Sequence, residues 1–117
     1  MADDDFSERL ARIRQRFAAA LPGKIDDSIA ALPKMSYADP EAIETIVVVH
    51  RKLHEMCGVA PSIGFPATGK AARAAESVLR TPAKTKRPLT SDEIAAFMTE
   101  IDGLRSAAQS ELQSNIG

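Results

Sequence analysis

A chain of 117 residues that is 44% apolar can bury one hydrophobic core, but it is too short to divide comfortably into two domains. Its 15 Lys and Arg residues nearly balance its 16 Asp and Glu residues, so charge gives no reason to expect a nucleic acid or a membrane as a partner. A single Cys excludes an internal disulfide, and no early apolar run resembles a signal peptide or a membrane span. We therefore expect one domain, residues 1–117, in the cytoplasm.

The first third of the chain has a helical pattern that is broken by proline. Asp5 and Glu8 form a capping-box pattern, and the apolar residues that follow recur at helical spacing, which predicts a helix over residues 6–20. Pro22 and the glycine after it interrupt the pattern. We expect residues 23–32 to form either a short additional helix or a kinked extension of the first.

Two longer helices are predicted in the middle of the chain. Asp39 followed by Pro40 is typical of a helix start, and the apolar residues over 40–60 are spaced four and three alternately, as in a helix bundle. Pro61 ends this pattern, and a short turn leads to an Ala-rich helix over residues 65–80. A turn this short predicts an antiparallel hairpin.

The last helix follows a basic, proline-containing linker at residues 81–90. Thr90 and Glu93 form a second capping box, and apolar residues at helical spacing predict a helix over residues 91–114. The low aromatic content, 4%, also suits packed helices better than a sheet. The predicted fold is all-α: an up-down-up-down four-helix bundle with a short additional helix near the N-terminus.

Both histidines and the only cysteine lie in the predicted helix 40–60. His54 is one residue past the core residue Leu53, so it points about 100° away from the core stripe, toward the boundary with water. Gly58 lies one turn later on the same face, where glycine costs ~1 kcal/mol relative to alanine. It either leaves clearance for a bulky group to reach the imidazole or begins the end of the helix, and helix patterns alone favour neither.

His50, His54 and Cys57 occupy positions i, i+4 and i+7 on one helix face, a spacing that could hold Zn²⁺ or Cu. Three ligands without an obvious fourth make a weak case, and we expect no metal site. We expect His50 instead to be a partly buried neighbour that orients His54, and Cys57 to be a small packing residue.

Residues 46–79 resemble the histidine-containing phosphotransfer (HPt) domain of bacterial two-component phosphorelays. The family pattern is a histidine, a glycine four residues on, a second glycine ten residues from the histidine, and an Ala-rich helix with an acidic residue about twenty-two on. His54, Gly58, Gly64 and Glu76 fall in this register. HPt domains are four-helix bundles whose exposed histidine accepts a phosphoryl group and passes it on.

The resemblance implies that His54 is the phosphoryl acceptor. Its partners would be a response-regulator receiver domain, a hybrid histidine kinase, or both, and the receiver would supply the Mg²⁺. The protein would then be a phosphocarrier with no cofactor and no turnover of its own, and we expect a monomer that binds neither nucleic acid nor membrane. The expected docking surface surrounds His54 and includes Arg51 and Glu55.

Cys57 departs from the family pattern, because many HPt domains carry a lysine at this position. The substitution removes a cation that could neutralise the phosphoryl group. The hairpin places residues near Gly69 to Arg73 opposite the acceptor histidine, so Lys70 and Arg73 are the candidates to replace that charge, with Gly69 as a further clearance position. A solvated helix face is the more common place for any single Lys or Arg.

Two other functions remain open from the sequence. The first is an HPt-like protein that docks on a kinase or a response regulator and regulates it without carrying phosphate, which the loss of the lysine makes plausible. The second is a metal-binding helical protein that uses His50, His54 and Cys57.

Overall fold

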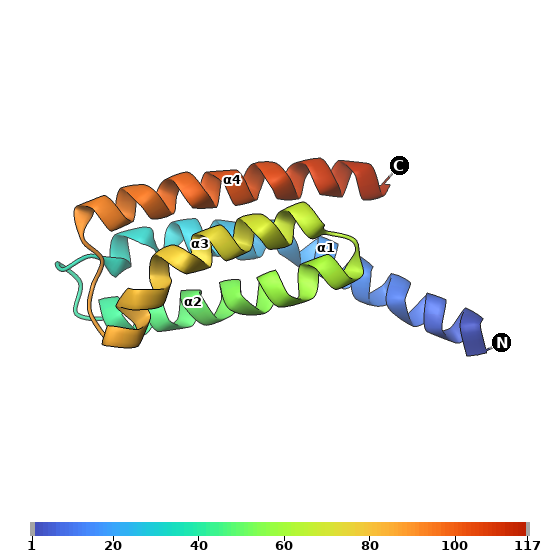
Figure 1. Cartoon of the computed structure of the whole chain (residues 1–117), viewed down its shortest axis with the longest axis horizontal. Coiled ribbons are helices and arrows are strands. Elements are labelled where there is room, and N and C mark those ends of the chain that lie inside the picture. The colour runs from blue at the N-terminus through green and yellow to red at the C-terminus, as the bar shows by residue number, and fades with distance from the viewer. Residues whose placement is uncertain (1, 117) are drawn as a thin grey trace.

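The computed structural model describes the backbone of residues 2–116 and the side chains of residues 5–114. The four α-helices are α1 (Ala2–Ala30), α2 (Ala42–Val59), α3 (Pro66–Thr85) and α4 (Ser91–Ile116). Two short 3-10 helices, η1 (Leu32–Met35) and η2 (Ala60–Ile63), follow α1 and α2. Successive α-helices run in opposite directions (Figure 1), so the predicted all-α four-helix bundle is confirmed.

Residues 23–30 continue α1 through Pro22, so the first helix is extended, which was one of the two alternatives, and the predicted separate helix over residues 23–32 is not found. Pro22 lacks the N–H that would bond one turn back, but the helix is held on both sides of it by Leu21 and Ile25, which are buried in the core. The start of this helix was also predicted wrongly. α1 begins at Ala2, so Asp5 and Glu8 lie inside the helix and do not form a capping box.

The end of α3 also differs from the prediction, since residues 81–85 belong to the helix and not to a linker. Pro82 lies inside α3, where both it and Ala83 are buried against the bundle. The helix ends at Lys86, which has a left-handed backbone with φ of 57°. The capping box predicted at the start of α4 is confirmed: the Glu93 N–H donates to Thr90 Oγ1 at 3.1 Å, and the Thr90 N–H donates to Glu93 Oε1 at 2.9 Å.

The core lies between the four helices and contains the apolar stripes predicted for α2 and α3. The small residues Ala72 and Ala75 of α3 are fully buried, which allows α2 and α3 to approach closely along their length. The largest fully buried side chains include Phe65, Phe97, Leu21, Met35, Ile46, Leu53 and Leu79. Among the described residues, we find no helix with both the length and the apolar character needed to cross a membrane.

The turn between α2 and α3 is fixed by contacts from both ends of the chain. Gly64 adopts the left-handed conformation with φ of 95°, which glycine accepts at no steric cost. Glu111 of α4 accepts the first free N–H groups of α3, from Ala67 at 3.0 Å and Thr68 at 2.6 Å. Arg14 of α1 donates through Nε to the carbonyl of Ile63 at 2.8 Å. The hairpin that carries the candidate site is therefore braced by α1 and α4.

Candidate functional site

His54 lies on the outer face of α2, beside α3. Its side chain is 71% exposed, whereas the neighbouring Leu53 is buried. Gly58 lies inside α2 one turn later, and a Cβ added there would meet no atom within 4 Å. Gly64, and not Gly58, takes the left-handed conformation that ends the hairpin turn. The surface beside the imidazole is therefore open to an approaching group, as the clearance explanation requires.

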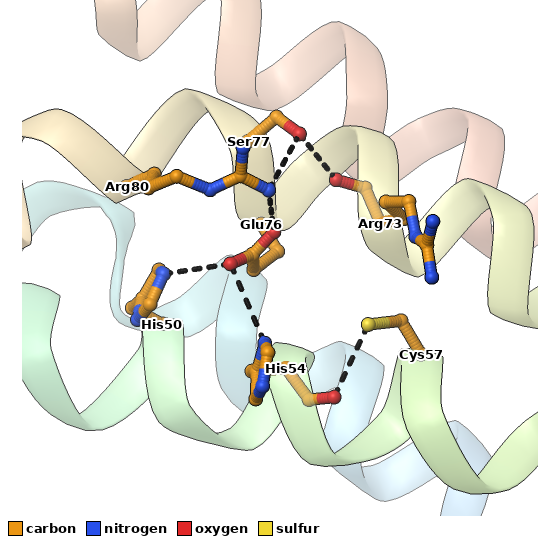
Figure 2. A network of polar contacts seen from close by, with 7 residues as sticks. All are labelled: His50, His54, Cys57, Arg73, Glu76, Ser77 and Arg80. Carbon is orange, nitrogen blue, oxygen red and sulfur yellow. Dashed lines mark hydrogen bonds and ion pairs between the residues drawn. The ribbon is translucent and has the colours of Figure 1, made fainter.

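Glu76 of α3 is the group that His54 faces. This carboxylate is 3% exposed, and its Oε1 atom lies 3.6 Å from His54 Nδ1 and 2.8 Å from His50 Nε2. Arg80 donates to the other oxygen, Oε2, at 2.7 Å. Figure 2 shows the four side chains converging between α2 and α3. A nearly buried carboxylate thus joins both histidines to one arginine.

Glu76 stays ionised in this setting. Burial raises the pKa of Glu76, but the hydrogen bond and charge of Arg80, followed by the nearby charge of His50, outweigh burial and bring the pKa below its usual 4.5. The separation between His50 Nε2 and Oε1 is short, but its geometry falls outside that of a well-aligned hydrogen bond, so the contact is electrostatic. The site presents a fixed negative charge behind the exposed imidazole.

This arrangement assigns different surroundings to the two nitrogens of His54. Nδ1 faces the Glu76 carboxylate, while Nε2 lies on the opposite edge of the ring (Figure 2). A carboxylate accepts but cannot donate, so it favours the proton on Nδ1 and leaves the lone pair of Nε2 free. An exposed imidazole with a free Nε2 lone pair is chemically a nucleophile.

The two predicted cations lie beside Cys57. Lys70 and Arg73 are exposed, and with Cys57, Gly69, Pro61 and Pro66 they line a surface pocket of about 230 Å³. Figure 2 places Arg73 next to Cys57, on the C-terminal side of His54 along α2. The structure therefore brings both predicted cations to the surface beside Cys57, which lies about one helical turn after His54 on α2.

Gly69 makes room within the protein itself. A Cβ at this position would lie 2.7 Å from Cγ and 2.8 Å from Cδ of Pro61, so the glycine lets the turn after α2 pack against α3. Gly69 does allow a close approach, as predicted, but the group that approaches is Pro61 of the same chain, so no space is left there for a partner. Arg51 and Glu55, the two predicted docking residues, are exposed on α2 on either side of His54 in the sequence.

Cys57 is buried, at 7% exposure, and its Sγ atom donates to the backbone carbonyl of His54 at 3.1 Å. It is a packing residue, as expected, and it contributes no cation to the surface. Within the part of the chain that the structure describes, no three His, Cys, Asp or Glu side chains are arranged to hold a metal ion.

Arg80 is the site residue that sequence reasoning missed. Its position four residues after Glu76 on a helix is a recognisable signal for an ion pair. Glu76 itself was recognised only by its register with the histidine. Its contact with His50 crosses from α3 to α2 and depends on the relative rotation of two helices, which the sequence pattern does not specify.

Comparison of the chain with family models, with curated proteins and with solved structures found no match. No family is assigned by comparison. The resemblance of residues 46–79 to HPt domains and the site geometry described above are the basis for a functional proposal.

Proposed function

We propose that this protein is a phosphorelay intermediate of the HPt type, which accepts a phosphoryl group on His54 from a receiver-domain aspartate or a kinase and passes it to another receiver. The observation that carries this proposal is an exposed imidazole whose Nδ1 atom faces a buried, ionised carboxylate. Such a relay protein would act in the bacterial cytoplasm, where its kinase and receiver partners are found.

The reaction follows from the two environments of the His54 ring. The Nε2 lone pair attacks the phosphorus of an aspartyl phosphate nearly in line, the P–O bond to the aspartate breaks, and the aspartate leaves as a carboxylate. The ring then carries a positive charge with its proton on Nδ1, which the Glu76 carboxylate stabilises. The driving energy comes from the acyl phosphate, and the Mg²⁺ belongs to the receiver.

Lys70 and Arg73 would offset the charge of the phosphoryl group. They lie beside Cys57, the position where many HPt domains carry a lysine. Both are exposed, so their attraction for a phosphoryl group is screened by water and salt. We expect each to assist the transfer without being indispensable.

One observation favours a second candidate function. Cys57 is buried and bonded to backbone, so the usual lysine has no direct replacement at its own position. An HPt-like protein that docks on a kinase or receiver and regulates it without carrying phosphate is therefore the alternative.

The two candidates are separated by a transfer assay with a panel of receiver domains that have been phosphorylated beforehand, in the presence of Mg²⁺. A relay protein gains one acid-labile, base-stable phosphoryl group from at least one receiver, and His54→Gln gains none. Binding of the same receivers by His54→Gln shows that the variant still docks. Docking without transfer in the unsubstituted protein would support the regulator and contradict the relay.

A further inference from the structure

One oxygen atom of Glu76 faces two histidines. Arg80 occupies Oε2 at 2.7 Å, which leaves Oε1 for His50 at 2.8 Å and for His54 at 3.6 Å. The shorter contact belongs to the histidine that is not the proposed acceptor. Figure 2 shows Oε1 between the two rings, closer to His50.

The two rings differ in burial, and this difference fixes the role that each can play. The His50 side chain is 24% exposed with Nε2 itself buried, whereas the His54 side chain is 71% exposed. A buried nitrogen needs a polar partner, and an unprotonated nitrogen facing a carboxylate would be repelled by it. The surroundings of His50 therefore favour a proton on Nε2, the atom that lies 2.8 Å from Glu76 Oε1.

The contact between His50 and Glu76 is also poorly aligned for a hydrogen bond. A poorly aligned contact gains less than a linear hydrogen bond and is easier to exchange. The ring centroids of His50 and His54 are 6.2 Å apart with an interplanar angle of 17°, and Oε1 lies 2.8 Å from His50 Nε2 and 3.6 Å from His54 Nδ1. A small movement of the Glu76 side chain would therefore shorten one contact and lengthen the other.

We propose that His50 is a positioning residue that holds the Glu76 carboxylate away from His54 until His54 is phosphorylated. This inference rests on the proposed function. When Nε2 of His54 forms its bond to phosphorus and the aspartate leaves, the ring becomes positively charged and its Nδ1–H attracts Oε1 more strongly than a neutral His50 does. The carboxylate then moves to His54, and His50 loses its partner.

The resting protein consequently keeps part of His54 in the tautomer with the proton on Nε2, and in that tautomer Nε2 has no lone pair with which to attack phosphorus. Removing His50 frees Oε1 for His54 and increases the reactive tautomer with the proton on Nδ1. A purely packing role for His50 predicts no such change, so the tautomer ratio separates the two roles.

The test measures the ¹⁵N chemical shifts of both imidazole rings in the unphosphorylated protein, at a pH of about 8.5 where an ordinary imidazole is neutral. His50→Leu is expected to raise the ratio of the Nδ1–H to the Nε2–H tautomer of His54 by about fivefold. The change is modest because the His54 ring is exposed and water weakens its interaction with the carboxylate. His50→Gln keeps an N–H donor and is expected to remain near the original ratio. Lys52→Gln, an exposed position on the same helix, is the matched control and should change nothing.

Glu76 decides whether the effect has the proposed cause. In a Glu76→Gln background, His50→Leu should no longer change the His54 tautomer ratio. An unchanged ratio in His50→Leu, or a change that persists without the carboxylate, would overturn the proposal. If His50→Leu does not fold, the unsubstituted protein still gives the answer, because a His50 ring with its proton on Nδ1 would also overturn it.

The phosphorylated protein supplies the second readout. On phosphorylation of His54, the ¹⁵N shift of His50 Nε2 should move toward that of a ring without a carboxylate partner, and a shift that stays in place would overturn the exchange. The tautomer measurement needs neither phosphate nor partner. If the protein showed the tautomer effect but were never phosphorylated, the proposed function would be contradicted. The positioning of Glu76 by His50 would still be supported.

Discussion

His54 Nδ1 lies 3.6 Å from Glu76 Oε1, and these two residues have opposite exposure: the imidazole is 71% exposed while the carboxylate is almost completely buried. The pair therefore joins a group that a partner can reach to a charge that the partner cannot displace. The helix α3 that carries Glu76 is held in place by the Glu111 cap from α4 and by its close packing on α2. The position of the carboxylate that His54 faces is thus set by the packing of the bundle.

Replacing Glu76 with Gln keeps the shape of the side chain and removes its charge. We expect the rate of phosphoryl transfer to His54 to fall roughly tenfold, because the positive charge on the ring is no longer stabilised in the transition state. Stability should change little, since Arg80 is 59% exposed and becomes hydrated. The initial rate from a phosphorylated receiver measures the effect, and Glu44→Gln, at an exposed position of α2, is the control. Equal rates for the two variants would contradict the role of the carboxylate.

Two substitutions of Gly58 distinguish its effect on helix stability from its effect on access to His54. Gly58→Ala should raise the free energy of unfolding by up to ~1 kcal/mol, because the new Cβ meets no atom and alanine favours the helix. Gly58→Leu should leave the fold intact but reduce receiver binding and transfer, since its side chain extends into the space beside His54. Urea unfolding and transfer assays measure the two effects. Gly103→Leu, at another unobstructed helix position, is the control for a bulky residue elsewhere, and equal transfer by both leucine variants would exclude the clearance role.

Gly69 should behave in the opposite way. Gly69→Ala places a Cβ within 2.8 Å of two Pro61 ring atoms, so the turn after α2 has to shift, at a cost of about 1–3 kcal/mol in the free energy of unfolding. Gly103→Ala is the matched control and should be neutral or slightly stabilising. Urea denaturation of both variants measures the difference. If Gly69→Ala were as stable as Gly103→Ala, the close approach of Pro61 would not be a constraint.

The start of α4 gives a prediction of pH dependence. The hydrogen bonds from Arg87 are the main reason why the pKa of Glu93 falls from 4.5 to about 2, with a further contribution from the Thr90 N–H. Because the folded pKa is the lower one, this stabilisation is fully present above pH 4.5 and is lost as the pH falls toward 2. Glu93→Gln should therefore be less stable than the unsubstituted protein by about 1–2 kcal/mol at neutral pH, after allowing for solvent exposure. Thermal unfolding between pH 7 and 2 should show the difference disappearing at the acid end, and a constant difference would contradict the ion pair.

The sequence predicts the fold well where helix patterns are strong. The apolar stripe of α2 and the capping box of Thr90 and Glu93 depend on local spacing, which a sequence displays directly. The errors fall at Pro22 and Pro82, where local preference indicates a break and burial in the core keeps the helix continuous. At both prolines, burial against the rest of the bundle keeps the helix continuous, and a single sequence does not show which residues pack against each other.

The candidate site was predicted in part for the same reason. The exposure of His54 follows from its position next to Leu53 on a helix, and the open space at Gly58 was one of two explanations that spacing allowed. The contact of His50 with Glu76 depends on how α3 is rotated about its axis relative to α2. Helical periodicity shows which residues share a face of one helix, but it does not show which residues of two helices face each other. Gly69 shows the same limit, since its spacing marks a close approach without identifying Pro61 as the neighbour.

Phosphorylation of the isolated protein by phosphoramidate tests the central claim most directly, because it needs no partner protein. Mass spectrometry of the intact chain and ¹⁵N spectra of the imidazole rings then report how many phosphoryl groups are added and to which nitrogen. We predict one phosphoryl group, on Nε2 of His54, and none on the partly buried His50. His54→Gln should remain unmodified under the same conditions. Modification of His50, or no modification at all when free histidine reacts, would contradict the account.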